Sequence, residues 1–331
     1  MKNTRDHGGG LDAAVDQFGG TKDTWVDLST GINPVPYPIG DISTQAWAAL
    51  PDQAAQQRLA DAARNFWNVP EDAAIIAAPG ASSLIACMPQ LTDHIGAYIP
   101  KPTYNEHAAA FRAHSKLLGG DDRDAQIHVY VHPNNPDGRL WPATQMGGRA
   151  LTVIDESFCD VAPEASHIEL SADHGTVVLK SFGKFWGLAG LRLGFAIARH
   201  STLHPEITLR KGLQKERVPD VSLTDMLGPW AVSGPALEIG ARALEDTDWA
   251  QMTRIRLSKD AARLDRIMTA KGATSIGGTT LFRLYEVDNA SAWQTRLAKG
   301  KVWSRIFPYS KSWLRLGLPA PDQWDQLEAA L

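Results

Sequence analysis

Short apolar runs alternate with helix-length segments through the middle of the chain, and this alternation limits the possible folds more than any other feature. Each run is short, and most end at a glycine, a proline or a charged residue, which is typical of fully buried strands. The runs span residues 74–78, 95–99, 127–131, 151–154, 177–179 and 193–198, and helix-length segments such as 82–91 and 105–118 separate several of them. The pattern therefore predicts an α/β fold with a mainly parallel sheet and helices on both faces.

The pattern changes after about Pro229. A long helical stretch covers residues 234–271, with an expected break near Asp246, and strand-like pieces follow at 280–287, 302–306 and 313–316 before a closing helix at 322–331. We therefore expect a large domain over residues 39–228 and a smaller C-terminal α+β domain over residues 229–331. Residues 1–38 form an N-terminal segment that joins them.

The charge and cysteine content of the 331-residue chain narrow the class of protein. The formal net charge is −4, from 33 basic and 37 acidic residues, so the chain has no global attraction for nucleic acid or acidic membranes, and local charge must hold any anionic ligand. Cys87 and Cys159 lie in apolar stretches without metal-ligand spacing, which predicts a reduced protein without a metal site. The N-terminus lacks the apolar core of a signal peptide, and no apolar run is long enough to cross a bilayer. A cytoplasmic protein with neither nucleic acid nor membrane as partner is expected.

Polar signatures follow the ends of the predicted strands. They are Gly80-Ala81-Ser82, Tyr104, Asn135, Asp155 and the stretch from Ser181 to Lys184. In open α/β sheets, ligands bind beyond the carboxyl ends of the parallel strands. These groups are therefore expected to meet in a single site.

Lys184 is the strongest candidate for chemistry in that site. It follows a predicted buried strand and lies in the glycine-rich string Ser-Phe-Gly-Lys-Phe-Trp-Gly-Leu-Ala-Gly-Leu-Arg-Leu-Gly, residues 181–194. Burial and nearby cations lower the pKa of a lysine, which leaves a free amine that can condense with an aldehyde. Arg192 and the Ser181 hydroxyl can bind a phosphate. Taken alone, Lys184 would more readily be interpreted as a solvated surface lysine, and nearby Lys180 is no worse a candidate.

The whole string from 181 to 194 closely resembles the lysine motif of fold-type I pyridoxal 5'-phosphate (PLP) enzymes, which share the aspartate-aminotransferase fold. The resemblance implies that Lys184 carries PLP as a Schiff base and that Asp155, upstream in Val-Ile-Asp-Glu-Ser-Phe, pairs with the protonated pyridine nitrogen. A carboxylate at the end of a buried strand could instead be a helix cap or a structural ion pair. The chain departs from the family at Phe158, where a tyrosine often donates to the ring oxygen of PLP.

The resemblance assigns further residues to the cofactor. His-Pro-Asn-Asn-Pro-Asp-Gly at 132–138 is similar to the Asn-Pro-Thr-Gly signature of aminotransferases, so Asn135 would donate to the ring oxygen. Tyr104 would stack on the pyridine ring. The PLP phosphate would be bound by Gly80, Ala81 and Ser82, where a strand ends and a helix begins, and by Ser181 and Arg192 of the lysine string. A second departure is Leu50, since relatives often have a tyrosine there that reaches the cofactor of the neighbouring subunit.

Both ends of the chain resemble a narrower group. His7-Gly-Gly, the segment Asp-Leu-Ser-Thr-Gly-Ile-Asn-Pro at 27–34, and Leu-Arg-Leu-Gly-Leu-Pro at 314–319 are similar to the threonine-phosphate decarboxylases of cobalamin biosynthesis. That resemblance implies that Arg315 binds the substrate α-carboxylate and that His7, Asn33 and Arg305 hold the substrate phosphate. The N-terminal segment would then contribute to the substrate site. His7 could also belong to a functionless terminus, and Arg305 to a surface salt bridge.

The resemblance implies a homodimer that decarboxylates a small phosphorylated amino acid, O-phospho-L-threonine, to (R)-1-amino-2-propanol O-phosphate. A histidinol-phosphate-type aminotransferase is the alternative, because it would use the same residues on a different Cα bond. A non-enzymatic protein of the same fold is disfavoured, since such a protein would have little need of Lys184, Asp155, Asn135 and Arg192 together.

Overall fold

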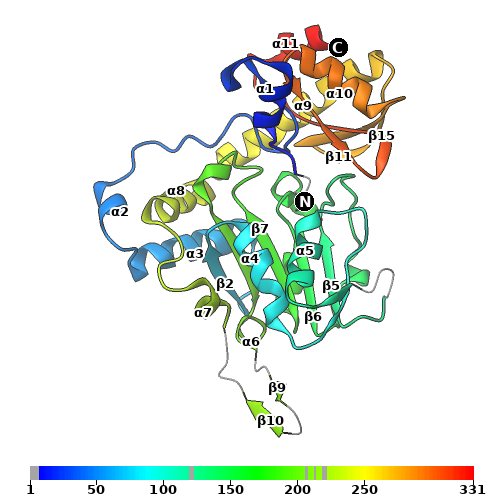
Figure 1. Cartoon of the computed structure of the whole chain (residues 1–331). Coiled ribbons are helices and arrows are strands. Elements are labelled where there is room, and N and C mark those ends of the chain that lie inside the picture. Colours follow the sequence, from blue (N-terminus) through cyan, green and yellow to red (C-terminus); the bar gives the residue numbers. More distant parts are fainter. Residues whose placement is uncertain (1–6, 119–122, 206–207, 212–213, 218–221) are drawn as a thin grey trace.

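A mixed sheet of mostly parallel strands forms the centre of the molecule (Figure 1). The computed structural model describes residues 7–118, 123–205, 208–211, 214–217 and 222–331. The strand order is β2-β8-β7-β6-β5-β3-β4, and β8 is antiparallel to both of its neighbours. The strands are β2 (Ala73–Ala78), β3 (Gly96–Tyr98), β4 (Leu117–Leu118), β5 (Ile127–Val131), β6 (Leu151–Asp155), β7 (Thr176–Ser181) and β8 (Gly194–Arg199). The predicted α/β fold class is confirmed.

The central strands are buried on both faces because alternate side chains enter two different hydrophobic cores. Val153 of β6 and Val177 of β7 pack on the side of α4 (Ala81–Cys87) and α5 (Asn105–Ala113). The next residues along, Ile154 and Val178, pack on the side of α3 (Gln53–Trp67) and α8 (Gly234–Glu245). Strands that are covered on both sides need continuous apolar runs, which is why they could be recognised from the sequence.

One expected helix ends earlier than the sequence indicates. The segment 105–118 was expected to be helical throughout, but α5 ends at Ala113 and residues 117–118 form β4. Gly96 and Ala97 of β3 pair in parallel with Leu117 and Leu118. These two residues therefore extend the edge of the central sheet and do not continue the helix.

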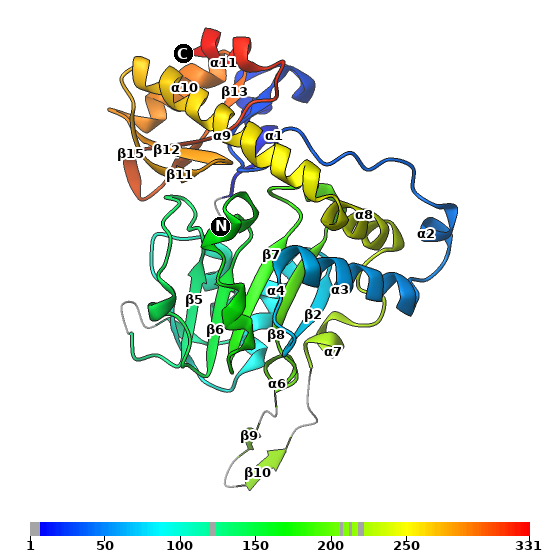
Figure 2. The ribbon, with the colours of Figure 1, turned by 180° about the vertical axis from the view of Figure 1, so that it is seen from behind.

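The C-terminal part of the chain forms a second, antiparallel sheet (Figure 2). Its strand order is β11-β12-β15-β14. The elements are α9 (Thr247–Ala270), β11 (Thr274–Thr279), β12 (Phe282–Glu286), α10 (Ala290–Lys299), β13 (Val302–Trp303), β14 (Arg305–Phe307), β15 (Ser310–Gly317) and α11 (Trp324–Ala330). The helix break expected near Asp246 lies between α8 and α9. The sequence did not predict β11 or α10.

The N-terminal segment is built into the C-terminal sheet region. After α1 (Leu11–Phe18), β1 (Val26–Asp27) pairs in parallel with β13. The N–H of Leu28 donates to the carbonyl of Trp303, and the N–H of Gly317 donates to the carbonyl of Leu28. The chain then crosses to the large sheet through α2 (Thr44–Ala48). This path brings residues from both ends of the sequence to the carboxyl edge of the central strands.

The remaining helices lie at the periphery of the large sheet. They are α6 (His200–Leu203) and α7 (Leu223–Leu227), and the strands β9 (Thr208–Lys211) and β10 (Gln214–Arg217) pair as a hairpin between them. Although it follows Pro229, α8 packs against α3 of the large sheet. The domain boundary at residue 229 stays a prediction. None of the described helices combines the length and apolar character needed to span a membrane.

Candidate active site

Most of the side chains proposed for the cofactor line one cavity of about 120 Å³ at the carboxyl ends of the parallel strands. The sequence-predicted residues in its wall are Ala81, Ser82, Tyr104, Asn135, Asp155, Ser181, Lys184 and Arg192. They come from the start of α4, the segment that leads into α5, and the ends of β5, β6 and β7. Ser157 and Phe158, which follow β6, complete the wall near Asp155. The structure thus brings together groups separated by about a hundred residues of chain.

Lys184 reaches this cavity from the loop after β7. Burial lowers the pKa of its amine to about 8, and the positive charges of Arg315 and Arg192 act in the same direction against the attraction of Asp155. Its Nζ lies 5.2 Å from the centre of the Phe158 ring. The unprotonated, nucleophilic form of this amine is therefore far more populated near neutral pH than that of an ordinary lysine.

Lys180, the other lysine considered from the sequence, has a different environment. Its Nζ donates to Glu156 at 2.5 Å and lies 3.9 Å from Asp160, and all three side chains are buried. Burial alone would lower the pKa of Lys180, but the two carboxylates raise it above the usual value. Lys180 is thus a structural cation that stays protonated, and Lys184 is the candidate nucleophile.

Asp155 is held by two partners at the end of β6. Its Oδ1 accepts from the backbone N–H and the hydroxyl of Ser157, at 3.0 and 2.5 Å, and its Oδ2 is 2.8 Å from Nε2 of the buried His107. Burial alone would raise the pKa of Asp155, but the hydrogen bond and charge of His107, with the Ser157 bonds, leave it below the usual value. The carboxylate therefore stays ionised and can pair with a cation in the cavity.

The sequence did not predict a role for His107. It lies on α5, three residues after Tyr104, which precedes the first residue of that helix, and the two rings meet edge to face with their centroids 6.1 Å apart. This spacing was the available signal, but the contact with Asp155 joins residues 48 apart in the chain. A fold was needed to see it.

A candidate anion site lies beside Lys184, where β2 turns into α4. Gly80 has φ +84° and ψ 158°, a conformation open essentially to glycine, and a Cβ there would lie 2.6 Å from Nη2 of Arg192. The missing side chain lets the guanidinium approach the turn. The Ser82 and Ser181 side chains line the same cavity. A guanidinium with two hydroxyls nearby is well suited to bind a phosphate.

A second cavity of about 240 Å³ adjoins the first and shares Tyr104 and Asn135 with it. His7, Arg305 and Arg315 line it. The N-terminal end is fixed there, because the N–H of Gly9 donates to the Ser29 hydroxyl at 2.7 Å and Arg305 donates to the carbonyl of His7 at 2.8 Å. His7 Nε2 lies 3.1 Å from Glu106. Three of the four residues proposed for the substrate therefore face one cavity.

Arg315 is a buried cation that lacks a carboxylate partner in the part of the chain that the structure describes. It donates to Asn135 Oδ1 and, at 2.7 Å, to the carbonyl of Ser29, while its Nε has no hydrogen-bond partner among the described residues. Burial, followed by the charge of Arg305, lowers the pKa of Arg315 to about 10. Arg305 and Arg315 are directly opposed on β14 and β15, an arrangement that like charges destabilise. A bound anion would relieve this repulsion.

Asn33 was expected to hold the substrate phosphate, but its side chain is directed at the Lys184 loop. It is buried, its Nδ2 donates to the carbonyl of Phe185 at 2.8 Å, and its Oδ1 accepts from Arg256 at 2.6 Å. Both polar ends of the amide are therefore used within the protein. This position suits a residue that shapes the lysine loop better than one that binds substrate.

The residues present fit PLP, the group that the lysine motif implies. An aldehyde needs a free amine, which Lys184 offers. A pyridinium nitrogen needs an ionised acceptor, which Asp155 offers, and a phosphate needs donors such as those around Arg192. Tyr104 lines the cavity as an aromatic wall, and Nδ1 of His107 is a buried polar atom without a partner among the described residues.

Capture of PLP by the apoprotein is expected to depend on pH with a midpoint near 8, the pKa of Lys184. Only the unprotonated amine condenses with an aldehyde, so the rate rises as pH approaches 8 and levels off above it. Stopped-flow measurement of the visible absorption that develops on mixing with PLP checks this. A rate that still climbs toward the ordinary lysine pKa of about 10.4 would contradict the environment described for Lys184.

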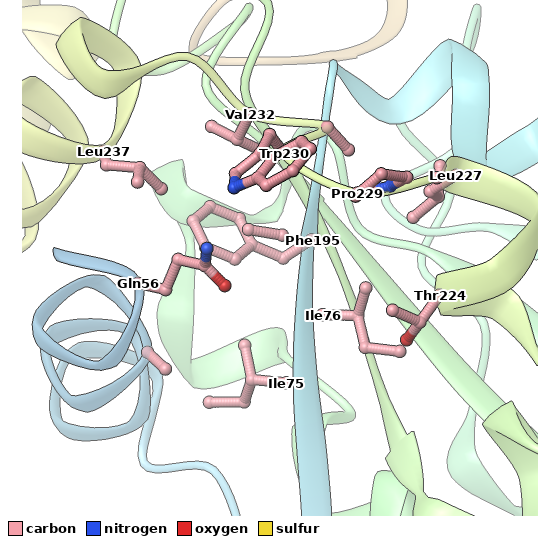
Figure 3. Close-up of a pocket in the computed structure, with 14 residues that line it drawn as sticks. Gln56, Ile75, Ile76, Phe195, Thr224, Leu227, Pro229, Trp230, Val232 and Leu237 are labelled. Atoms are coloured by element: carbon pink, nitrogen blue, oxygen red, sulfur yellow. The ribbon is translucent and has the colours of Figure 1, made fainter. Parts of the chain in front are cut away.

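Three further features carry no chemistry of this kind. His132, Glu156 and Cys159 lie close enough to hold a metal ion, but both His132 nitrogens are hydrogen-bonded, to the Ala165 carbonyl and the Trp141 N–H, and Glu156 is paired with Lys180. Cys87 and Cys159 are free thiols. A cavity of about 520 Å³ lies near the outer strand β2, where Trp230 is seen beside Val232 and above Phe195 (Figure 3), and its wall contains no ionisable side chain.

Comparison with known proteins agrees with the geometry. The model of the aminotransferase class I and II family matches residues 121–331. The chain is 36% identical to a threonine-phosphate decarboxylase of Sinorhizobium sp., over 96% of this chain and 93% of that protein. It is 32% identical to the threonine-phosphate decarboxylase of Pseudomonas aeruginosa, over 98% and 97%.

Among solved structures, the fold is similar to a histidinol-phosphate aminotransferase from Sinorhizobium meliloti in complex with pyridoxal-5'-phosphate. The TM-score is 0.76, and the match covers 97% of this chain and 92% of that one at 16% sequence identity. At this identity the likeness concerns the fold alone.

Proposed function

The chain belongs to the family of class I and II aminotransferases, whose members depend on PLP, and on that premise we propose that it decarboxylates O-phospho-L-threonine. The products are CO₂ and (R)-1-amino-2-propanol O-phosphate. The cofactor residues and the substrate residues described above are part of this proposal.

The observation that carries the proposal is the pair of opposed guanidinium groups, Arg305 and Arg315, beside the cavity that holds Lys184. A substrate with two anionic groups, a carboxylate and a phosphate, could bind to both guanidinium groups. Arg315, the more buried of the two, has an unpartnered Nε and suits the planar carboxylate. Arg305 and His7, which line the same cavity and are joined by a hydrogen bond, suit the phosphate.

PLP, when bound, supplies an electron sink for the pair of electrons that the Cα–carboxylate bond leaves behind as CO₂ departs. The ionised Asp155 would hold a proton on the pyridine nitrogen, with His107 and Ser157 fixing its orientation. Arg192 would bind the cofactor phosphate. Lys184, the amine of the cavity, would return a proton to Cα. Phe158 offers no hydroxyl for the ring oxygen, so Asn135, whose Oδ1 already accepts from Arg315, would donate there through its Nδ2.

The rival activity is amino transfer of the histidinol-phosphate type, which would use the same lysine and aspartate. Near-full-length likeness to two threonine-phosphate decarboxylases supports decarboxylation.

The two activities are separated by supplying histidinol phosphate and 2-oxoglutarate to the PLP-loaded protein. We expect no glutamate above the background of a reaction without enzyme, while O-phospho-L-threonine is consumed without any 2-oxo acid. Chromatography of the amino acids gives the readout. Steady formation of glutamate would show that the proposed decarboxylase activity is wrong and that the protein is an aminotransferase. The proposed cofactor site would be unaffected.

We also propose a homodimer. Large apolar side chains are exposed over α2 and the loop before α8, with Trp47 70%, Leu50 65% and Trp230 56% exposed. Exposed apolar side chains gathered on one side of a molecule are typical of an interface. Sedimentation velocity over a range of protein concentrations tests this, and a concentration-independent monomer would contradict it.

The cytoplasmic location and the absence of nucleic-acid or membrane partners stay predictions.

A further inference from the structure

Asn33 connects the N-terminal segment to the backbone that carries Lys184. Its N–H donates to the carbonyl of Lys184 at 3.0 Å, and its side-chain Nδ2 donates to the carbonyl of Phe185 at 2.8 Å. One residue therefore fixes two consecutive peptide groups of the lysine loop. Because Asn33 is 1% exposed, water does not compete for these bonds.

The two segments are also packed without room between them. Gly187 has φ +68°, and a Cβ at this position would lie 2.6 Å from Cα of Pro36 and 2.9 Å from the carbonyl oxygen of Asn33. The N–H of Tyr37 donates to the carbonyl of Trp186 at 2.9 Å. Residues 33–37 thus run directly along the backbone of residues 184–187, and a displacement of one segment would displace the other.

Helix α9 holds Asn33 from the other side. Arg256 donates from Nη2 to Asn33 Oδ1 at 2.6 Å, and its Nη1 lies 3.2 Å from Asp260 one helical turn further on. Two residues earlier, Arg254 donates to the carbonyl of Asp160 at 2.8 Å and lies 5.2 Å from the ring of Phe185. The same helix packs against β11 and β12 of the C-terminal sheet, toward which it extends in Figure 2.

Arg256 is the charged one of the two donors that orient the Asn33 amide, and the other is the N–H of Val35 at 3.1 Å. A guanidinium can only donate, so it fixes the amide with Oδ1 toward α9 and Nδ2 toward the lysine loop. A charged donor on the amide oxygen also strengthens the bond that the amide N–H makes at its other end. Without Arg256 the amide oxygen would keep only the N–H of Val35, at 3.1 Å, as its donor, and the bond from Nδ2 to the carbonyl of Phe185 would be held less firmly.

We propose that Arg256, acting through Asn33, is a positioning residue that fixes the amine of Lys184 in the cavity and ties the lysine loop to the helix of the C-terminal sheet. This inference rests on the proposed role of Lys184 as the lysine that binds PLP. Neither Arg256 nor Asn33 lines the two cavities described above. The pair therefore acts on Lys184 through the backbone and not on the substrate.

The test is a pH titration of the visible absorption of bound PLP in the full-length protein, for wild type, Arg256→Gln, Arg256→Lys and Asn33→Ala. Loosening the loop exposes the amine to water, so the titration midpoint of Arg256→Gln is expected to shift by about one pH unit, with several-fold faster loss of PLP on dilution. Arg256→Lys, which keeps one charged donor, should recover part of the shift. Because Arg256 acts through Asn33, the double variant Asn33→Ala with Arg256→Gln should shift no further than Asn33→Ala alone.

Arg263→Gln is the matched control, since it removes an arginine of the same helix whose partner, Glu328, lies away from the cavities. It should titrate like wild type. Circular dichroism reports whether each variant folds. If Arg256→Gln does not fold, the titration midpoint of Arg256→Lys provides the test. A midpoint in the Arg256 variants equal to wild type, with PLP bound, overturns the inference and leaves the PLP assignment standing. A wild-type protein that shows no absorption from bound PLP overturns both.

Discussion

Lys184→Ala is expected to bind no PLP covalently and to turn over O-phospho-L-threonine more slowly by roughly 10²–10⁴-fold, the usual loss when a group that moves a proton is removed. We expect this loss because the Lys184 amine lines the same cavity as Asp155 and because its pKa is lowered to about 8. Borohydride reduction of the PLP-loaded protein, followed by peptide mass spectrometry, locates the lysine that carries the cofactor.

Lys259→Ala is the control for that experiment, because Lys259 is exposed on α9. It should retain PLP on Lys184 and wild-type turnover. Lys180 is unsuitable as a control, since its removal would leave Glu156 buried without its ion-pair partner. Covalent retention of PLP by Lys184→Ala, on any other lysine, would show that the nucleophile has been misassigned.

Arg315→Gln is expected to lower kcat/KM for O-phospho-L-threonine by roughly 10²–10³-fold. Truncating one partner of a buried, hydrogen-bonded charge pair costs about 2–5 kcal/mol, and here the substrate carboxylate would lose its partner. The loss should appear mainly in KM, because the carboxylate is held before the bond breaks. Arg315→Lys should recover little, since an ammonium cannot reproduce the two parallel bonds of a guanidinium.

Arg305→Gln provides the comparison that separates the two anion positions. If Arg305 binds the phosphate, this variant should lose the preference for O-phospho-L-threonine over threonine, whereas Arg315→Gln should lose turnover of both. Steady-state kinetics on the two substrates gives the answer. Equal effects of the two substitutions on both substrates would contradict separate carboxylate and phosphate positions.

The strands of the large sheet could be predicted from the sequence because strands that are buried on both faces appear as continuous apolar runs. A strand such as β6, with neighbours β5 and β7 and a hydrophobic core on each face, must be apolar throughout. β11 (Thr274–Thr279) shows no apolar run. It is a largely exposed edge strand, composed mostly of threonine, serine and glycine, and its pairing with β12 is irregular after Ser275. Its pairing with β12 becomes visible only in the fold.

The candidate site divides in the same way. Lys184 and Asp155 could be proposed from the sequence because the strings that contain them resemble the motifs of a known family, whereas the local pattern alone left Lys184 no better a candidate than Lys180. His107 and Arg256 could not, because their partners Asp155 and Asn33 lie 48 and 223 residues away in the chain. Asn33 was associated with the substrate because its neighbours in the sequence resemble those of a substrate-binding segment. The structure places its side chain on the lysine loop instead.

The central claim is tested most directly by incubating the PLP-loaded protein with O-phospho-L-threonine labelled at its carboxyl carbon, with no 2-oxo acid present, and following the products by NMR. The account predicts that the label leaves as CO₂ while 1-amino-2-propanol O-phosphate forms in equal amount. Retention of the label in an organic product, or no turnover until a 2-oxo acid is added, would contradict it.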